Sequence, residues 1–131
     1  MAEAPGPGPA QGAGAGHAPT EIKLHQKSRV MEIAFDDGKT FRLPYEFLRV
    51  HSPSAEVRGH GPGQEVLQTG KRDIEIRALE PVGSYAVQPA FSDSHATGIY
   101  SWDYLYYLGE NQDHLWAEYL EKLSKAGASR G

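Results

Sequence analysis

Four side chains of the types that bind metal ions are spread through the middle of this chain. His51, His60 and His95 carry imidazole nitrogens, and Asp93 lies two residues before His95. Imidazole and carboxylate together suit iron, manganese or zinc, so one hypothesis is a metal site built from these four residues. The other hypothesis is structural, with Asp93 and His95 stabilising a turn between two strands through hydrogen bonds to the backbone.

Other kinds of active site find less support in the residue pattern. The chain contains no cysteine, which excludes disulfides, thiolate ligands and a thiol nucleophile. No histidine is followed two residues later by an acid, although iron oxygenases that use two histidines and a carboxylate usually show that spacing. The run Gly59–Gly63 contains Pro62, which lacks the N–H that a phosphate-binding loop needs. We therefore expect no catalytic activity.

Composition and charge limit the class of protein and the kind of partner. The 131 residues are 39% hydrophobic and 23% charged, which is typical of one domain with a modest core. A net charge of −4, with no run of more than two basic residues, argues against binding to nucleic acid. No apolar segment approaches the ~20 residues of a membrane span. We expect a cytoplasmic location and another protein as the partner, with neither nucleic acid nor membrane involved.

The N-terminal segment differs in composition from the rest. Residues 1–19 consist almost wholly of alanine, glycine and proline. Such a segment has too few large apolar side chains to offset the entropy of ordering, so we expect a disordered tail. Its deletion should then leave the melting temperature within about 2 °C of the full chain.

The first half of the remaining chain alternates polar and apolar residues with the period of half-buried strands. This pattern predicts an antiparallel meander of three strands, over residues 20–26, 30–35 and 40–43. Gly38 falls where the second hairpin needs a positive φ. Pro44 can begin a helix because its missing N–H would be unpaired there, so a short helix is predicted over 45–50 with Phe47 and Leu48 facing inward.

The second half predicts further strands and then helices. Strands are expected at 73–79, at 85–91 with Pro89 near an edge or a bulge, and at 97–100, with a turn over 92–95. Ser101 should cap a helix that ends at Gly109, and a last amphipathic helix should run over 113–126. The expected fold is α+β, with a largely antiparallel sheet and short helices at one side. Its domain spans 20–109, followed by the C-terminal helix and a short tail in 110–131.

Aromatic residues are concentrated in the first predicted helix after Ser101. A short helix cannot bury all of them on one side, so Tyr104 and Tyr107 are predicted to project outward while Trp102 faces in. These three residues, Trp102, Tyr104 and Tyr107, are the candidates for a protein interface. The alternative is that the C-terminal helix covers them through Leu115 and Tyr119.

The order of these segments resembles a known family. The stretch 83–105, together with Leu43-Pro44, Phe47-Leu48-Arg49 and Gly59–Gly63, resembles the N-terminal domain of gamma-butyrobetaine hydroxylase and its stand-alone bacterial relatives, over roughly Ile22 to Gly109. Relatives occur in front of an oxygenase barrel, attached to iron–sulfur carrier ATPases, or alone. The resemblance implies a non-catalytic accessory module that serves an oxygenase or a metal-handling partner.

The resemblance also bears on metal binding. The family's domain holds a structural zinc through three cysteines after a Leu-Arg pair and one later histidine, and the matching positions here are Ser52, Ser54, Val57 and His95. A serine hydroxyl is a poor zinc ligand and valine offers no donor atom, so this zinc site is expected to be lost. The oxygenase barrel of the full-length hydroxylases follows the matched region. We therefore expect no cofactor, with iron or zinc at the His/Asp site as the alternative.

Overall fold

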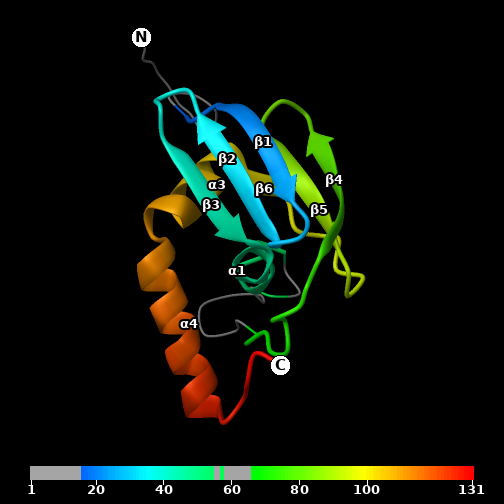
Figure 1. Cartoon of the computed structure of the whole chain (residues 1–131), viewed down its shortest axis with the longest axis vertical. Helices are drawn as coiled ribbons and strands as arrows, with labels where there is room; N and C mark the ends of the chain where they lie inside the picture. Colours follow the sequence, from blue (N-terminus) through cyan, green and yellow to red (C-terminus); the bar gives the residue numbers. More distant parts are fainter. Residues whose placement is uncertain (1–15, 55–56, 58–65) are drawn as a thin grey trace.

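The computed structural model describes residues 16–54, 57 and 66–131, and it contains two small antiparallel sheets with helices beside them (Figure 1). Each sheet has three strands, in the orders β1-β2-β3 and β4-β5-β6. The predicted α+β class with antiparallel pairing is confirmed.

The first sheet follows the predicted meander closely. It consists of β1 (Pro19–His25), β2 (Val30–Phe35) and β3 (Thr40–Pro44). On β2 the side chains of Met31, Ile33 and Phe35 are at most 3% exposed, whereas the residues between them are half-buried. The alternation in the sequence thus fixed which face of this sheet joins the core.

Helix α1 (Tyr45–Val50) has the predicted bounds, but all six of its residues are buried. Pro44 precedes the helix with extended backbone angles and is not its first residue. The buried residues include the charged Glu46 and Arg49, and buried charges need partners. Arg130, 84 residues away, donates two hydrogen bonds to Glu46, at 2.7 and 2.9 Å.

The second sheet consists of β4 (Ile76–Val82), β5 (Ala86–Phe91) and β6 (Tyr100–Ser101). The strand predicted at 73–79 therefore starts three residues later and continues through Pro81. Proline is tolerated there because β4 lies at the edge of its sheet. Pro89 lies in β5 beyond the reach of β6, which pairs only with Ala86 and Val87.

The strand predicted over 97–100 is almost absent, since β6 contains only two residues. Before β6 the backbone passes close to the end of α1. A Cβ atom on Gly98 would lie 2.4 Å from Ser52 Oγ, so this close approach requires glycine. The chain here contacts α1 instead of extending the sheet.

Two helices complete the described fold. In α3 (Trp102–Glu110) the Ser101 hydroxyl accepts a hydrogen bond from the Tyr104 N–H at 3.1 Å, which confirms the predicted cap. Gly109 lies inside α3 and does not end it. The ring of Phe41 occupies the space of its missing side chain, with Cγ 2.3 Å from an ideal Cβ. Helix α4 (Gln112–Ala126) ends at Gly127, whose φ is 64°.

The core joins both sheets to α1 and α3, and a smaller cluster holds α4. In that cluster Val50 contacts Tyr119 and Leu123 of α4. The segment after α4 returns to the body of the domain, because backbone groups of residues 129 and 130 accept hydrogen bonds from Gly70 and Arg72. Helix α4 is therefore attached through its side chains and through the segment that follows it.

Part of the expected tail contacts the domain. The N–H of Asp36 donates to the oxygen of Ala18 at 2.9 Å. The His17 ring stacks on Tyr106 with 3.5 Å between centroids, and the backbone N–H of His17 donates to Asp103 at 3.0 Å. Residues 16–19 thus belong to the domain, whereas residues 1–15 of the expected tail lie outside the described part.

These contacts change the expected effect of a truncation. His17→Ala should lower the melting temperature by about 2–5 °C, since an aromatic pair contributes about 1 kcal/mol. A chain that starts at Thr20 should lose the same amount. The matched control is His114→Ala, because His114 is an exposed histidine with a surface ion pair to Glu118. Equal thermal melts for His17→Ala and the wild type would contradict the contact.

Candidate functional site

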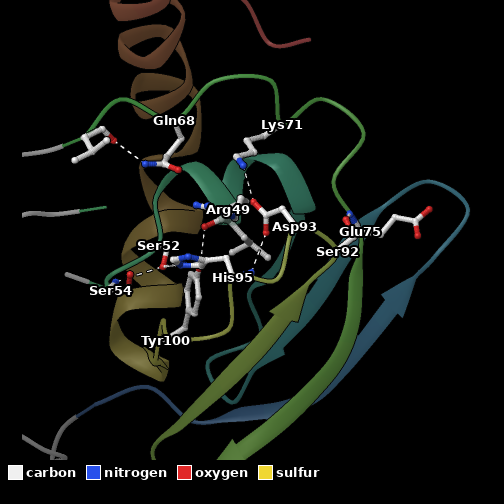
Figure 2. A network of polar contacts seen from close by, with 12 residues as sticks. Arg49, Ser52, Ser54, Gln68, Lys71, Glu75, Ser92, Asp93, His95 and Tyr100 are labelled. Atoms are coloured by element: carbon white, nitrogen blue, oxygen red, sulfur yellow. Dashed lines mark hydrogen bonds and ion pairs between the residues drawn. The ribbon is translucent and has the colours of Figure 1, made fainter. Parts of the chain in front are cut away.

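An ion cluster that includes the buried Arg49 connects α1 to the turn after β5 (Figure 2). Arg49 Nε donates to Asp93 Oδ2 at 2.9 Å, and Lys71 Nζ donates to the same oxygen at 2.6 Å. The Arg49 side chain is 7% exposed and that of Asp93 22%. One carboxylate thus holds two cations, which leaves the cluster with one positive charge in excess.

The ionisation of Asp93 reflects this environment. Burial alone would raise the pKa of the Asp93 carboxyl group, but hydrogen bonds from Lys71 and the His95 N–H, and the charge of Arg49, lower it to about 2. Asp93 is therefore fully ionised at neutral pH. A carboxylate engaged in this way is poorly placed to act as a base or to accept a metal ion.

His95 lies in the turn that the sequence predicted at 92–95. Its backbone N–H donates to Asp93 Oδ1 at 3.1 Å, and its oxygen accepts from the Phe91 N–H at 2.9 Å. The ring Nε2 is 2.9 Å from the Ser52 hydroxyl, within hydrogen-bonding distance (Figure 2). These are the bonds expected of a histidine that stabilises the turn.

The positions that the resemblance matches with zinc ligands lie close together. Ser52 Oγ bonds His95 and also accepts a hydrogen bond from the Ser54 N–H at 3.3 Å. The N–H of Val57 donates to the Ser54 oxygen at 3.1 Å. All four residues are buried. Ser52 and His95 are therefore joined through their side chains, and Ser54 and Val57 follow Ser52 through backbone hydrogen bonds.

The other metal-ligand candidates are placed differently. His51 Nδ1 bonds the oxygen of Phe47 at 3.0 Å, and burial lowers the pKa of its imidazole. His60 lies outside the described residues. Within the described part of the chain, no three histidine or acidic side chains gather as a metal site would require. The four-residue metal hypothesis stays a prediction that depends on His60.

One polar atom of the cluster has no partner. Arg49 Nη1 is buried and makes no hydrogen bond in the described part of the structure. Nearby, the Tyr100 hydroxyl donates to the oxygen of Leu48, and burial raises the pKa of this phenol. Arg49 and Lys71 were not predicted as site residues. The available signal was the pair of charged residues, Glu46 and Arg49, among the apolar residues of α1.

A hollow of about 330 Å³ lies beside this cluster, between the end of α1, residues 66–68, α3 and α4. Tyrosine side chains form part of its wall. The Tyr104 hydroxyl donates to the oxygen of His51 at 2.5 Å, and the Tyr119 hydroxyl donates to the oxygen of Gln68 at 2.7 Å. Of the other lining residues, half are aliphatic, namely Val50, Val57, Val66, Leu67 and Leu115, and half are polar, namely His51, Ser52, Gln68, Glu118 and Lys122.

The three predicted interface residues differ in exposure. Tyr107 is 50% exposed and stacks on Tyr104 with 6.2 Å between ring centroids. Tyr104 is half-buried and lines the hollow with Leu115 of α4, so it does not project outward as predicted. Trp102 is also half-buried, and its indole N–H donates to the oxygen of Ser84 at 2.8 Å.

The expectation that no serine lies in a Gly-x-Ser-x-Gly pattern was wrong for the sequence itself. Residues 127–131 read Gly-Ala-Ser-Arg-Gly, which matches the Gly-x-Ser-x-Gly elbow of serine hydrolases. That elbow joins a strand to a helix. Here Gly127 follows the end of α4, and Ser129 uses its backbone oxygen to bond Gly70. The motif therefore has the spacing of a nucleophile elbow without its structural context.

Comparison with known proteins identifies the family. A family model described as "Gamma-butyrobetaine hydroxylase-like, N-terminal" matches residues 22–106. The chain belongs to this family. The described helices of this family member include none long and apolar enough to cross a membrane.

Solved structures of similar proteins agree in fold. Two solution NMR structures are 49% and 46% identical, cover 95% and 88% of this chain and 91% of their own, and have TM-scores of 0.78 and 0.77. A crystal structure from Acidithiobacillus ferrooxidans, of a DUF971-family protein of unknown function, is 44% identical with a TM-score of 0.58, covering 70% of this chain and 91% of its own. No curated protein matches the chain.

The depressed pKa of Asp93 predicts how stability depends on pH. The carboxylate stabilises the fold above pH 4, and this contribution is lost as the pH falls from about 4 through 2. Asp93→Asn should therefore destabilise the protein at pH 7 by about 2–4 kcal/mol, because Arg49 loses its counter-charge. Urea unfolding measured from pH 7 to pH 2.5 should show that the difference in the free energy of unfolding between Asp93→Asn and the wild type becomes smaller below pH 4.

The exposed Asp73 provides the control for this experiment. Its side chain is 83% exposed and lies 3.5 Å from Arg29, so Asp73→Asn should change stability by less than about 0.5 kcal/mol. A loss for Asp93→Asn that stays constant down to pH 2.5 would show that Asp93 does not stabilise the fold through its charge.

The role of His95 can be tested separately. His95→Ala removes the imidazole partner of the buried Ser52 hydroxyl and should cost about 1–3 kcal/mol. His95→Gln should lower the free energy of unfolding by less, because the glutamine side chain is long enough to place its amide near the position of the His95 Nε2 atom. Thermal melts with and without a chelator distinguish the hypotheses, since a metal bound only to the native state adds stability. We expect no chelator effect on the wild type. A fall of several degrees confined to the wild type would instead favour a metal site.

Proposed function

We propose that this domain is a cytoplasmic, non-catalytic accessory module that binds another protein through the surface formed by Tyr107 and the adjacent hollow. The observation that carries this proposal is the position of Tyr107, half-exposed on α3 and stacked on a tyrosine that lines the hollow. Tyrosine is enriched in protein interfaces, where its ring contributes apolar contact area and its hydroxyl can hydrogen-bond. A concave apolar surface next to an exposed ring favours a docking role.

The state of the acidic and imidazole groups supports a non-catalytic role. Asp93 is held by two cations, and His95 is engaged with Ser52. The His51 imidazole uses Nδ1 to bond its own helix. A general base or metal ligand needs an accessible lone pair, and these groups use their polar atoms to hold the fold.

The family description supports the class of partner. It names an N-terminal region of gamma-butyrobetaine hydroxylase-like proteins. The resemblance described above implies that an oxygenase barrel follows this region in the full-length hydroxylases. We propose that the partner is an oxygenase or a protein that handles iron–sulfur clusters or metal ions. An iron or zinc site that includes His95 and His60 is the alternative function.

A site-specific photo-cross-linker tests the proposed surface. p-Benzoylphenylalanine at position 107, introduced in the source cell, should give a discrete cross-linked product with one protein. Position 85 is the matched control, because Tyr85 is 56% exposed and does not line the hollow. Leu67→Asp, which places a charge in the hollow, should reduce the product from position 107. The same products from both positions, or none from position 107, would refute the proposal.

A further inference from the structure

Among the described residues that line the hollow, Lys122 carries a charge with no ion-pair partner in the described part of the chain. Apart from tyrosines, its ionisable lining residues are His51, Glu118 and Lys122. Glu118 lies 3.0 Å from the His114 ring on the same helix. His51 is neutral at pH 7, since burial lowers the pKa of its imidazole and the charge of Lys122 lowers it further. No described acidic group lies within ion-pair distance of Lys122.

The position of Lys122 places this charge at the rim of an apolar surface. Leu115, Glu118, Tyr119 and Lys122 are spaced three or four residues apart, so they share one face of α4, and all four line the hollow. Lys122 is exposed, whereas Tyr119 is 5% exposed. Val50 and Val57, 8% and 6% exposed, provide buried apolar surface in the same lining.

The size of the hollow limits what it can hold. Sites for drug-sized molecules span about 300–1,000 Å³, and this hollow of about 330 Å³ is at the lower end. The hydroxyl protons of Tyr104 and Tyr119 are already donated to backbone oxygens, so these rings contribute mainly apolar surface. The hollow therefore suits one or two apolar side chains with a negative charge beside them.

We infer that the partner docks an acidic segment here, with a bulky apolar side chain inserted into the hollow and a neighbouring carboxylate paired with Lys122. This inference rests on the proposed function and specifies the chemistry of the partner at the same surface. A basic segment would meet Lys122 with like charge. Glu118 could attract such a segment, but its carboxylate is turned toward His114, which does not line the hollow.

Small probes of matched structure test this chemistry without the partner. N-acetyl-L-leucine carries an apolar side chain and a carboxylate, N-acetyl-L-leucinamide lacks the charge, and N-acetylglycine lacks the side chain. In ¹H–¹⁵N NMR titrations, N-acetyl-L-leucine should shift the signals of residues 50–52, 66–68 and 115–122. It should bind about 3–5-fold more tightly than the amide, since an exposed ion pair contributes up to about that factor. N-acetylglycine should give no saturable shifts.

Two lysine variants on α4 test whether Lys122 is the residue that pairs with the carboxylate of the probe. Lys122→Met keeps an unbranched side chain and should abolish the preference for the acid over the amide. Lys125→Met is the matched control, because Lys125 lies 3.6 Å from Glu121 and does not line the hollow. The preference should also shrink in 0.5 M salt, where exposed charges are screened.

The outcomes separate the inference from the proposed function. Equal affinity for acid and amide, or a preference that survives Lys122→Met, would overturn the role of Lys122 while leaving the hollow as an apolar docking surface. An absence of shifts at the hollow with both leucine probes would overturn the insertion of an apolar side chain. The cross-link from position 107 reports on partner binding in either case, because it is measured with the partner itself and depends neither on the leucine probes nor on Lys122.

Discussion

The pairing of buried charges on α1 is the constraint on which the rest of the structure depends. A helix of six residues that is buried on every side could be wholly apolar, yet this one contains Glu46 and Arg49. Each charge must meet an opposite charge from a distant part of the chain, because an unpaired ion in the interior costs several kcal/mol. Arg49 thereby fixes the turn after β5 through Asp93, and Glu46 fixes the segment after α4 through Arg130. Both sheets and the last helix are thus positioned around α1.

Much of the fold could be predicted from local patterns. The meander of β1, β2 and β3 and the bounds of α1 agree with prediction to within one residue at most ends, because alternation and turn residues act locally. The errors occurred where a distant residue determined the conformation. Gly109 resembled a helix stop, but its missing side chain makes room for Phe41. The strand expected at 97–100 was shortened because Gly98 lies against Ser52. Neither contact leaves a periodic signal in the sequence.

The candidate site was harder to predict for the same reason. Asp93 and His95 were singled out correctly as turn residues, since their spacing within the turn is local. The cations that hold Asp93 come from positions 44 and 22 residues earlier. A side chain of lysine or arginine in the sequence is normally read as exposed, so nothing distinguishes Arg49 or Lys71 from the other basic residues. The hollow forms only where four separate segments come together, so the sequence of any one segment contains no pattern that predicts it.

The bond between Arg130 and Glu46 has a consequence for synthesis of the protein. The two residues are 84 positions apart, so Glu46 emerges from the ribosome long before its partner exists. Until Arg130 has been synthesised, burial of α1 would leave the Glu46 carboxylate unpaired in an apolar interior. The nascent chain can form the local β1–β3 meander early, but α1 gains its full set of partners only after Arg130 has been synthesised. Contacts of such long range slow folding, and a chaperone that shields this surface would act on the domain during that interval.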